Sequence, residues 1–289
     1  MEKYKHGEQV HNLKDPSIIV PEIMKLLNPK SVVDFGCGLG TFLCAFKKNG
    51  VVDVLGLDGA WVNKALLYKY INPDEFVETN LEKEIKFNKK YDLVVSLEVA
   101  EHLSADSADI FVKNLVNSGN TILFSAAVPN QGGQNHINEQ WLTYWEEKFL
   151  KYGFIIYDVI RPILWNYSEI FPWYKQNMVL LAPKGLKFNL DVISVPDSMR
   201  NIIHYDLFNL KTADVSVLKS RNLYILEKEA ELESKNVYIR EREVELESKN
   251  VYIREREQYI DSLEEKINRI KKTRSYKTFV KIEFFLRRI

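Results

Sequence analysis

A glycine-rich segment constrains the fold of this 289-residue chain more than any other feature. The apolar run VVDF is followed directly by the pattern Gly36-x-Gly38-x-Gly40, and then by a helix-like stretch. Glycines allow a tight turn from a strand into a helix, and they let the backbone approach a ligand closely because no Cβ stands in the way. The segment therefore predicts a strand, a ligand-binding turn and a helix. The dinucleotide-binding fingerprint would need its third glycine where the chain has Thr41, which disfavours a dehydrogenase.

Short apolar runs alternate with helical patterns through residues 1–185, which is typical of a parallel sheet with crossover helices. The expected strands cover residues 31–35, 53–57, 75–78, 91–97 and 121–127. Two further runs, at 155–164 and 177–182, are close enough in sequence to form an antiparallel pair after a helix at 138–152. We therefore expect an α/β fold in residues 1–185.

The second expected strand ends at Asp58, on the same edge of the sheet as the glycine turn. A carboxylate at this position can accept hydrogen bonds from both ribose hydroxyls of an adenosine. The alternative is an aspartate that only caps its own loop.

Four segments taken in order resemble the class I S-adenosylmethionine-dependent methyltransferases. VVDFGCGLG resembles motif I, and GLDG resembles the ribose-binding end of the second strand. FVETNL places Asn80 where many members have an aspartate beside adenine, and YDLVVSLEVAEHL resembles motif IV of the branch that ends in Glu-x-x-Glu-His. The resemblance implies a Rossmann-like seven-stranded sheet with a reversed last strand, and S-adenosyl-L-methionine as cofactor. The cofactor-binding residues that it implies are Asp34, Gly36, Cys37, Gly38, Gly40, Asp58, Gly59, Asn80, Leu81 and Glu98.

Four ionisable side chains are candidates for the chemistry: Glu98, Glu101, His102 and His136. All four follow strands at the carboxyl edge, where a doubly wound fold binds its ligands. His136 is a candidate base or acceptor contact, with loop hydrogen bonding as the alternative. His102 is a catalytic candidate whose alternative is a supporting or capping role beside Glu101. We expect no metal ligands among them.

Charge and hydropathy limit the location and the partners. The formal net charge is zero, so the chain as a whole is not built to bind nucleic acid. No stretch approaches the roughly 18 apolar residues needed to cross a bilayer, and the charged segment MEKYKHGEQVHNLKD lacks an apolar secretion core. We therefore expect a cytoplasmic protein.

A different pattern begins near residue 223. ELESKNVYIRERE occurs twice, at 231–243 and 245–257, with apolar residues at strict sevens and mostly Lys or Arg at the matching second positions of the heptad. The repeat predicts a long charged helix at 223–272 with a half-formed coiled-coil seam, which makes self-association a candidate role. Residues 186–222 have no clear period and are assigned to a linker or small subdomain.

The last segment, residues 273–289, predicts a basic amphipathic tail. Phe279, Ile282 and Leu286 would share one face of a helix among several Lys and Arg side chains. Such a segment can lie on the inner face of a membrane. Packing on its own domain or on a partner copy is the alternative.

The segments SAAVPNQGGQNHINEQWLTYW and LWNYSEIFPWYKQNMVLLA resemble bacterial methyltransferases found with glycan and surface-polysaccharide enzymes. This resemblance implies O-methylation of a sugar, with a glycan or nucleotide sugar as the methyl acceptor. One alternative is O- or N-methylation of a small metabolite. Another is a cofactor-binding scaffold that works through its helical extension.

Overall fold

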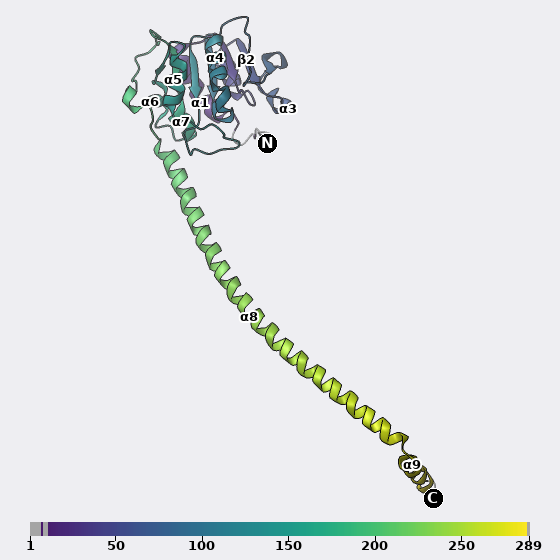
Figure 1. Ribbon diagram of the computed structural model, residues 1–289. Coiled ribbons are helices and arrows are strands. Elements are labelled where there is room, and N and C mark those ends of the chain that lie inside the picture. Colours follow the sequence, from purple (N-terminus) through teal and green to yellow (C-terminus); the bar gives the residue numbers. More distant parts are fainter. Residues whose placement is uncertain (1–6, 8–10, 288–289) are drawn as a thin grey trace. The chain divides into compact units, whose positions relative to one another are not determined.

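The computed structural model describes residue 7 and residues 11–287. The chain falls into two compact units, Met1–Ala213 and Asp214–Ile289. The helices of the first unit are α1 (Lys14–Leu27), α2 (Thr41–Lys48), α3 (Lys64–Leu67), α4 (Ala108–Ser118), α5 (Leu142–Leu150), α6 (Ile160–Leu164) and α7 (Pro172–Asn177) (Figure 1). Its strands are β1 (Ser31–Phe35), β2 (Asp53–Asp58), β3 (Phe76–Glu78), β4 (Leu93–Leu97), β5 (Ile122–Ser125), β6 (Phe154–Tyr157) and β7 (Val179–Pro183).

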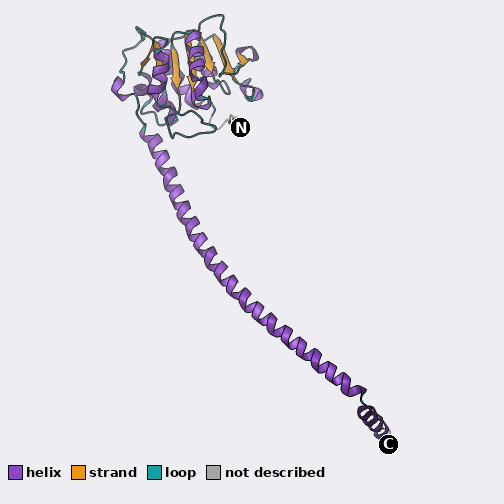
Figure 2. Ribbon diagram, viewed as in Figure 1, coloured by secondary structure: helices purple, strands orange, loops and turns teal. Residues whose placement is uncertain are grey.

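The strands form one sheet in the order β3-β2-β1-β4-β5-β7-β6 (Figure 2). Strands β1 to β5 pair in parallel, whereas β7 is antiparallel to both β5 and β6. The predicted seven-stranded sheet with a reversed last strand is confirmed. Because β1, β2, β4 and β5 are parallel, their carboxyl ends lie at one edge, where folds of this kind bind ligands.

Both faces of the sheet are buried, so its central strands are almost continuously apolar. Neighbouring residues on a strand point to opposite faces, and the core is divided accordingly. Val32 packs in a cluster with α1, α2 and α6, whereas Val33 packs in a second cluster with α4 and α5. Helices thus cover both faces of the sheet, and the polar groups of a site are left to the ends of the strands.

The predicted strand at 155–164 is wrong in its second half. Strand β6 ends at Tyr157, and α6 begins at Ile160. Pro162 explains the change, because proline cannot donate to a strand ladder but is tolerated in the first turn of a helix.

The second unit is helical. Helix α8 spans Tyr205–Lys272, so its first residues belong to the first unit, and α9 spans Arg274–Leu286. The long helix therefore starts within residues 186–222, which the sequence analysis assigned to a linker or small subdomain. Within α8 only Leu207 is buried, and no amphipathic period marks the helix. Arg288 and Ile289 of the predicted tail lie outside the described residues, as do the side chains of Tyr276 and Phe285. No helix in the described part of the chain is both long and apolar enough to span a bilayer.

Candidate active site at the carboxyl edge of the sheet

The glycine turn between β1 and α2 has the predicted form. Gly36, Gly38 and Gly40 have φ angles of 83°, 53° and 75°, in the left-handed region that favours glycine. A Cβ on Gly36 would also lie 2.4 Å from Cγ2 of Val99. The turn therefore requires glycine for its backbone conformation and for its close packing on the segment after β4.

Asp58 connects this turn to the end of β2. Its buried carboxylate accepts hydrogen bonds from the Gly38 amide (2.8 Å) and the Gly59 amide (2.6 Å). Burial raises the pKa of Asp58 to about 6, and these amides together with the Trp61 side chain oppose the rise. The Trp61 ring lies against Gly59, where a Cβ would approach it to 2.2 Å. Sequence reasoning missed Trp61, and its place shortly after the strand-tip aspartate was the available signal.

Asp34 and Cys37 lie beneath the turn. Burial and the nearby Asp58 carboxylate raise the pKa of Asp34 to about 8. Burial also raises the pKa of the Cys37 thiol, whose sulfur packs against β2 so closely that a Cβ on Gly56 would lie 2.7 Å from it. The Cys37 side chain thus belongs to the core, and only its backbone borders the turn. The buried carboxyl of Asp34 suits a ligand with a cationic group.

The third predicted element of the cofactor site follows β3. The exposed Asn80 side chain accepts a hydrogen bond from the Glu82 amide (2.9 Å), so its oxygen is used within its own turn. Leu81 is buried in the core beneath α4. The amide of Thr79 donates to the Asp58 carbonyl (2.7 Å), which places this segment beside the strand tip.

Glu98 follows β4 with a φ of 55°, an unusual backbone for a residue with a side chain. Its amide donates to the carbonyl and to the hydroxyl of Ser125, each at 3.0 Å. Its half-buried carboxylate accepts from the side-chain amides of Gln131 (2.7 Å) and Asn177 (3.1 Å). Burial raises the pKa of Glu98. Strained residues of this kind concentrate at functional sites.

Glu101, His102 and His136 are brought together by the loop after β5. The amides of Ile137 and Asn138 donate to the Glu101 carbonyl at 2.9 and 3.0 Å, and the two histidine rings meet edge to face with centroids 4.8 Å apart. Nδ1 of His136 lies 2.8 Å from Oε1 of Glu139. Glu98 belongs to the same region, because the charge of His136 acts on its carboxylate. The structure therefore brings all four predicted catalytic candidates together.

Burial dominates the electrostatics of this cluster. The Glu101 side chain is fully buried, and burial with the charges of Glu98 and Glu139 raises its pKa well above the usual value. Burial and the neighbouring His136 lower the pKa of His102 to about 4. His102 is therefore a neutral imidazole at physiological pH.

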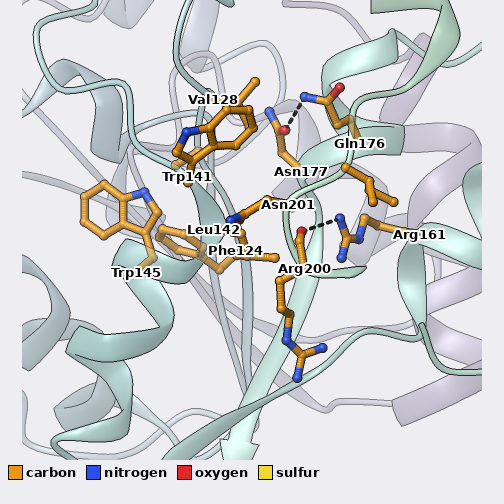
Figure 3. A pocket seen from close by; sticks show the side chains of 12 residues that line it. Phe124, Val128, Trp141, Leu142, Trp145, Arg161, Gln176, Asn177, Arg200 and Asn201 are labelled. Carbon is orange, nitrogen blue, oxygen red and sulfur yellow. Dashed lines mark hydrogen bonds between the residues drawn. The ribbon is translucent and has the colours of Figure 1, made fainter. Parts of the chain in front are cut away.

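A small cavity is lined by residues of β5, α5, α6 and α7 and of the segment before α8 (Figure 3). Trp141 and Trp145 line it together with Gln176 and Asn177, whose side chains are joined by a hydrogen bond of 2.9 Å. Its lining contains neither the glycine turn nor the four catalytic candidates, but Asn177 connects it to Glu98. Sequence reasoning noted Gln176 and Asn177 only for a family likeness, and it missed the bond from Asn177 to Glu98.

Comparison with known proteins identifies related domains. A family model described as a methyltransferase domain matches residues 11–155. Similar solved structures include DesVI of Streptomyces venezuelae, with 13% identity and a TM-score of 0.46 over 59% of this chain and 92% of that one. The methyltransferase domain of a bacterial CtHen1 has 20% identity and a TM-score of 0.43 over 62% and 100% of the two chains. PKMT2 from Rickettsia typhi in complex with AdoHcy has 13% identity and a TM-score of 0.44 over 63% and 55%. No curated protein sequence matches the chain.

Proposed function

The chain belongs to the methyltransferase family and uses S-adenosylmethionine, and from that premise we propose that it methylates a hydroxyl of a sugar, in a glycan or in a nucleotide-linked precursor. The cofactor supplies a methyl group on a sulfonium: the acceptor oxygen bonds to the methyl carbon, the carbon–sulfur bond breaks with its electron pair left on sulfur, and the hydroxyl loses its proton.

Asp58 is the residue that we assign to the ribose. A carboxylate has about four lone-pair positions. The Gly38 and Gly59 amides use two of them and the Trp61 side chain bonds to it as well, so acceptor capacity remains for a ribose hydroxyl. Asp34, Gly36, Gly38, Gly40 and the backbone of Cys37 would line the amino-acid part. An ammonium group bound there would stabilise the ionised form of the Asp34 carboxyl, whose pKa is about 8 without it. Asn80 and Leu81 would border adenine.

The acceptor side supports a polar, ring-shaped substrate. Sugar hydroxyls both donate and accept hydrogen bonds, and the amides of Gln131, Gln176 and Asn177 offer the same chemistry. In this structure these amides bond to one another, to Glu98 and to the His204 amide, so a sugar would exchange some of these bonds for its own. Trp141 is partly exposed beside them at the cavity in Figure 3, where an indole face can cover the apolar face of a sugar ring. This combination of amides and an open tryptophan is the observation that carries the proposal.

His136 is the residue that we assign to activation of the acceptor hydroxyl. Glu139 at Nδ1 fixes the ring orientation and leaves Nε2 for the site, as a carboxylate orients a catalytic histidine. Gly133 makes room for the ring, since a Cβ there would lie 2.2 Å from Nε2. Glu98, Glu101 and His102 surround this group as positioning residues.

The test is methyl transfer from isotopically labelled S-adenosylmethionine to a panel of nucleotide sugars and lipid-linked saccharides, with small phenols and amines in parallel. Labelled saccharide that depends on the enzyme supports the proposal, and His136→Ala should then lower kcat by roughly 10²–10⁴-fold. Transfer to the small metabolites alone would replace the sugar with the small-metabolite alternative.

We also propose that the protein is cytoplasmic and that α9 contacts the inner membrane face. Phe279, Ile282 and Leu286 are exposed on this helix, at 62%, 54% and 64% of their full areas, among basic side chains. Self-association and scaffolding are the alternatives to membrane contact for the second unit. The exposed apolar residues of α8 favour them.

A further inference from the structure

Glu101, His102 and His136 offer one ligand atom each, and these atoms all lie within 4.8 Å of one another. We propose that these three side chains bind one divalent metal ion. Two of them are adjacent on the turn Ala100–His102, and the third comes from the loop after β5. The backbone bonds from Ile137 and Asn138 to the Glu101 carbonyl hold that loop in place, so the set is preorganised.

Glu101 is the observation that points to a cation. Its side chain is completely buried, and among the described residues no side chain donates to it. Neither carboxylate oxygen has a hydrogen bond of normal geometry, and only the backbone amides of Glu101 and Ala127 act on it weakly. A buried carboxylate without a partner is costly, because the folded state must replace its lost hydration. A metal ion among the three ligands supplies the missing charge and the missing contact.

The surroundings have the charge that such an ion needs. Glu98 and Glu139 both act electrostatically on Glu101, so three carboxyl groups converge on two imidazoles. Glu139 contacts Nδ1 of His136, which directs Nε2 to the ligand cluster. A carboxylate behind a metal-binding histidine is the common outer arrangement in proteins, because it fixes the tautomer and the ring orientation. Glu98 is held by Gln131 and Asn177 and closes the side of the site.

The donor atoms select the class of metal. Two imidazole nitrogens and one carboxylate oxygen favour Zn²⁺, Mn²⁺ or Fe²⁺ over Ca²⁺, which prefers oxygen ligands throughout. Three protein ligands leave positions open for water or for a substrate oxygen. Resting on the proposed function, we assign an open position to the acceptor hydroxyl. With the ion bound, Nε2 of His136 is a ligand and no longer a base, so the metal takes over the activation that the proposed function gives to His136. A metal ion lowers the pKa of an oxygen that binds it, which favours release of the hydroxyl proton to water before the carbon–oxygen bond forms.

The test is a metal titration of the full-length protein after removal of metals with a chelator. Calorimetry and electron paramagnetic resonance with Mn²⁺, followed by competition with Zn²⁺, should give one site per chain. Loss of an outer partner already costs 10–100-fold in metal affinity, so Glu101→Gln and His136→Ala should each weaken binding by at least about 100-fold. The matched control is Glu84→Gln, a glutamate exposed at its ion pair with Lys113, which should bind Mn²⁺ as the wild type does.

S-adenosylmethionine binding by the same variants separates a lost ligand from a lost fold, because the Asp58 side of the site should be unchanged. Stoichiometric Mn²⁺ binding that Glu101→Gln abolishes, with cofactor affinity retained, supports the proposal. A metal-stripped wild type that binds neither ion, or a Glu101→Gln variant that binds as well as the wild type, overturns it. Saccharide methylation at full rate with chelator present would overturn the role of the metal and leave the proposed function standing. Metal binding without any methylated saccharide would overturn the proposed sugar acceptor and leave the metal site standing.

Discussion

The two units of this chain treat apolar side chains in opposite ways. In the first unit, residues such as Leu43 and Phe46 are completely buried, whereas in α8 residues such as Leu232 and Ile239 are 59% and 52% exposed. Helix α8 is supported locally by ion pairs such as Lys235–Glu231 and its repeat Lys249–Glu245, each worth about 0.2–0.5 kcal/mol. The first unit is therefore stabilised by its own buried core, whereas the second unit exposes apolar side chains that a partner could cover.

A substitution in the glycine turn should give the largest difference between the two units, because it should destabilise the first and leave α8 unchanged. Gly36→Ala combines a left-handed φ with a Cβ 2.4 Å from Val99, so we expect a loss of about 3–5 kcal/mol in the free energy of unfolding of the first unit. Near-ultraviolet circular dichroism would report that unit, while the helical far-ultraviolet signal of α8 should largely remain.

Gly50→Ala is the matched control for this variant. Gly50 has a φ of 95° but nothing within 4 Å of the new Cβ, so only backbone strain of about 1–2 kcal/mol is expected. Equal losses for the two variants would mean that the contact of the new Cβ with Val99 adds nothing to the backbone strain.

Removal of Asp58 sharpens the comparison by changing ligand binding without changing the fold. Asp58→Ala should weaken S-adenosylmethionine binding by about 1.5–3 kcal/mol, the scale of lost charged hydrogen bonds. Isothermal titration would measure the change. Asp53→Ala, at the exposed start of the same strand, should retain the wild-type affinity. Wild-type affinity in Asp58→Ala would remove this residue from the cofactor site.

The buried Asp34 carboxyl predicts a pH dependence that only the first unit should show. Below about pH 4 the group is protonated in both the folded and unfolded chain, so it carries no penalty. As the pH rises toward 8, the unfolded chain loses this proton while the folded chain keeps it, because its pKa is about 8. The unfolded state then binds fewer protons, so stability falls with rising pH.

Chemical denaturation at pH 5 and pH 8 tests this dependence without added cofactor. The wild type should be less stable at pH 8, and Asp34→Asn should reduce the difference. Asp58, with a pKa of about 6, adds to the same trend at lower pH and remains in the variant. The same pH difference in both proteins would contradict the assignment to Asp34.

The parts of the site that the sequence predicts are those with local requirements. Gly36 and Asp58 could be found because a strand-to-helix turn and a strand tip impose residue types at short spacing. The Glu98–Asn177 bond and the meeting of Glu101 with His136 depend on how distant segments fold back, so no spacing reveals them. Pro162 was a local signal for α6, yet the apolar period of the run outweighed it. For α8, the sequence predicts a helix with exposed apolar residues, but it does not identify the partner that would cover them.

The tail should have the smallest effect on methyl transfer and the clearest effect on location. Basic residues near an anionic surface contribute roughly 1 kcal/mol each, and the exposed apolar face of α9 can insert beside them. Flotation with anionic liposomes should therefore carry the full-length protein at low salt and release it at high salt. Truncation after Ile270 should abolish flotation, while kcat toward a water-soluble acceptor should stay near the wild-type value. Full-length protein that stays off anionic liposomes at low salt would reject the membrane role and leave α9, like α8, as a surface for a protein partner.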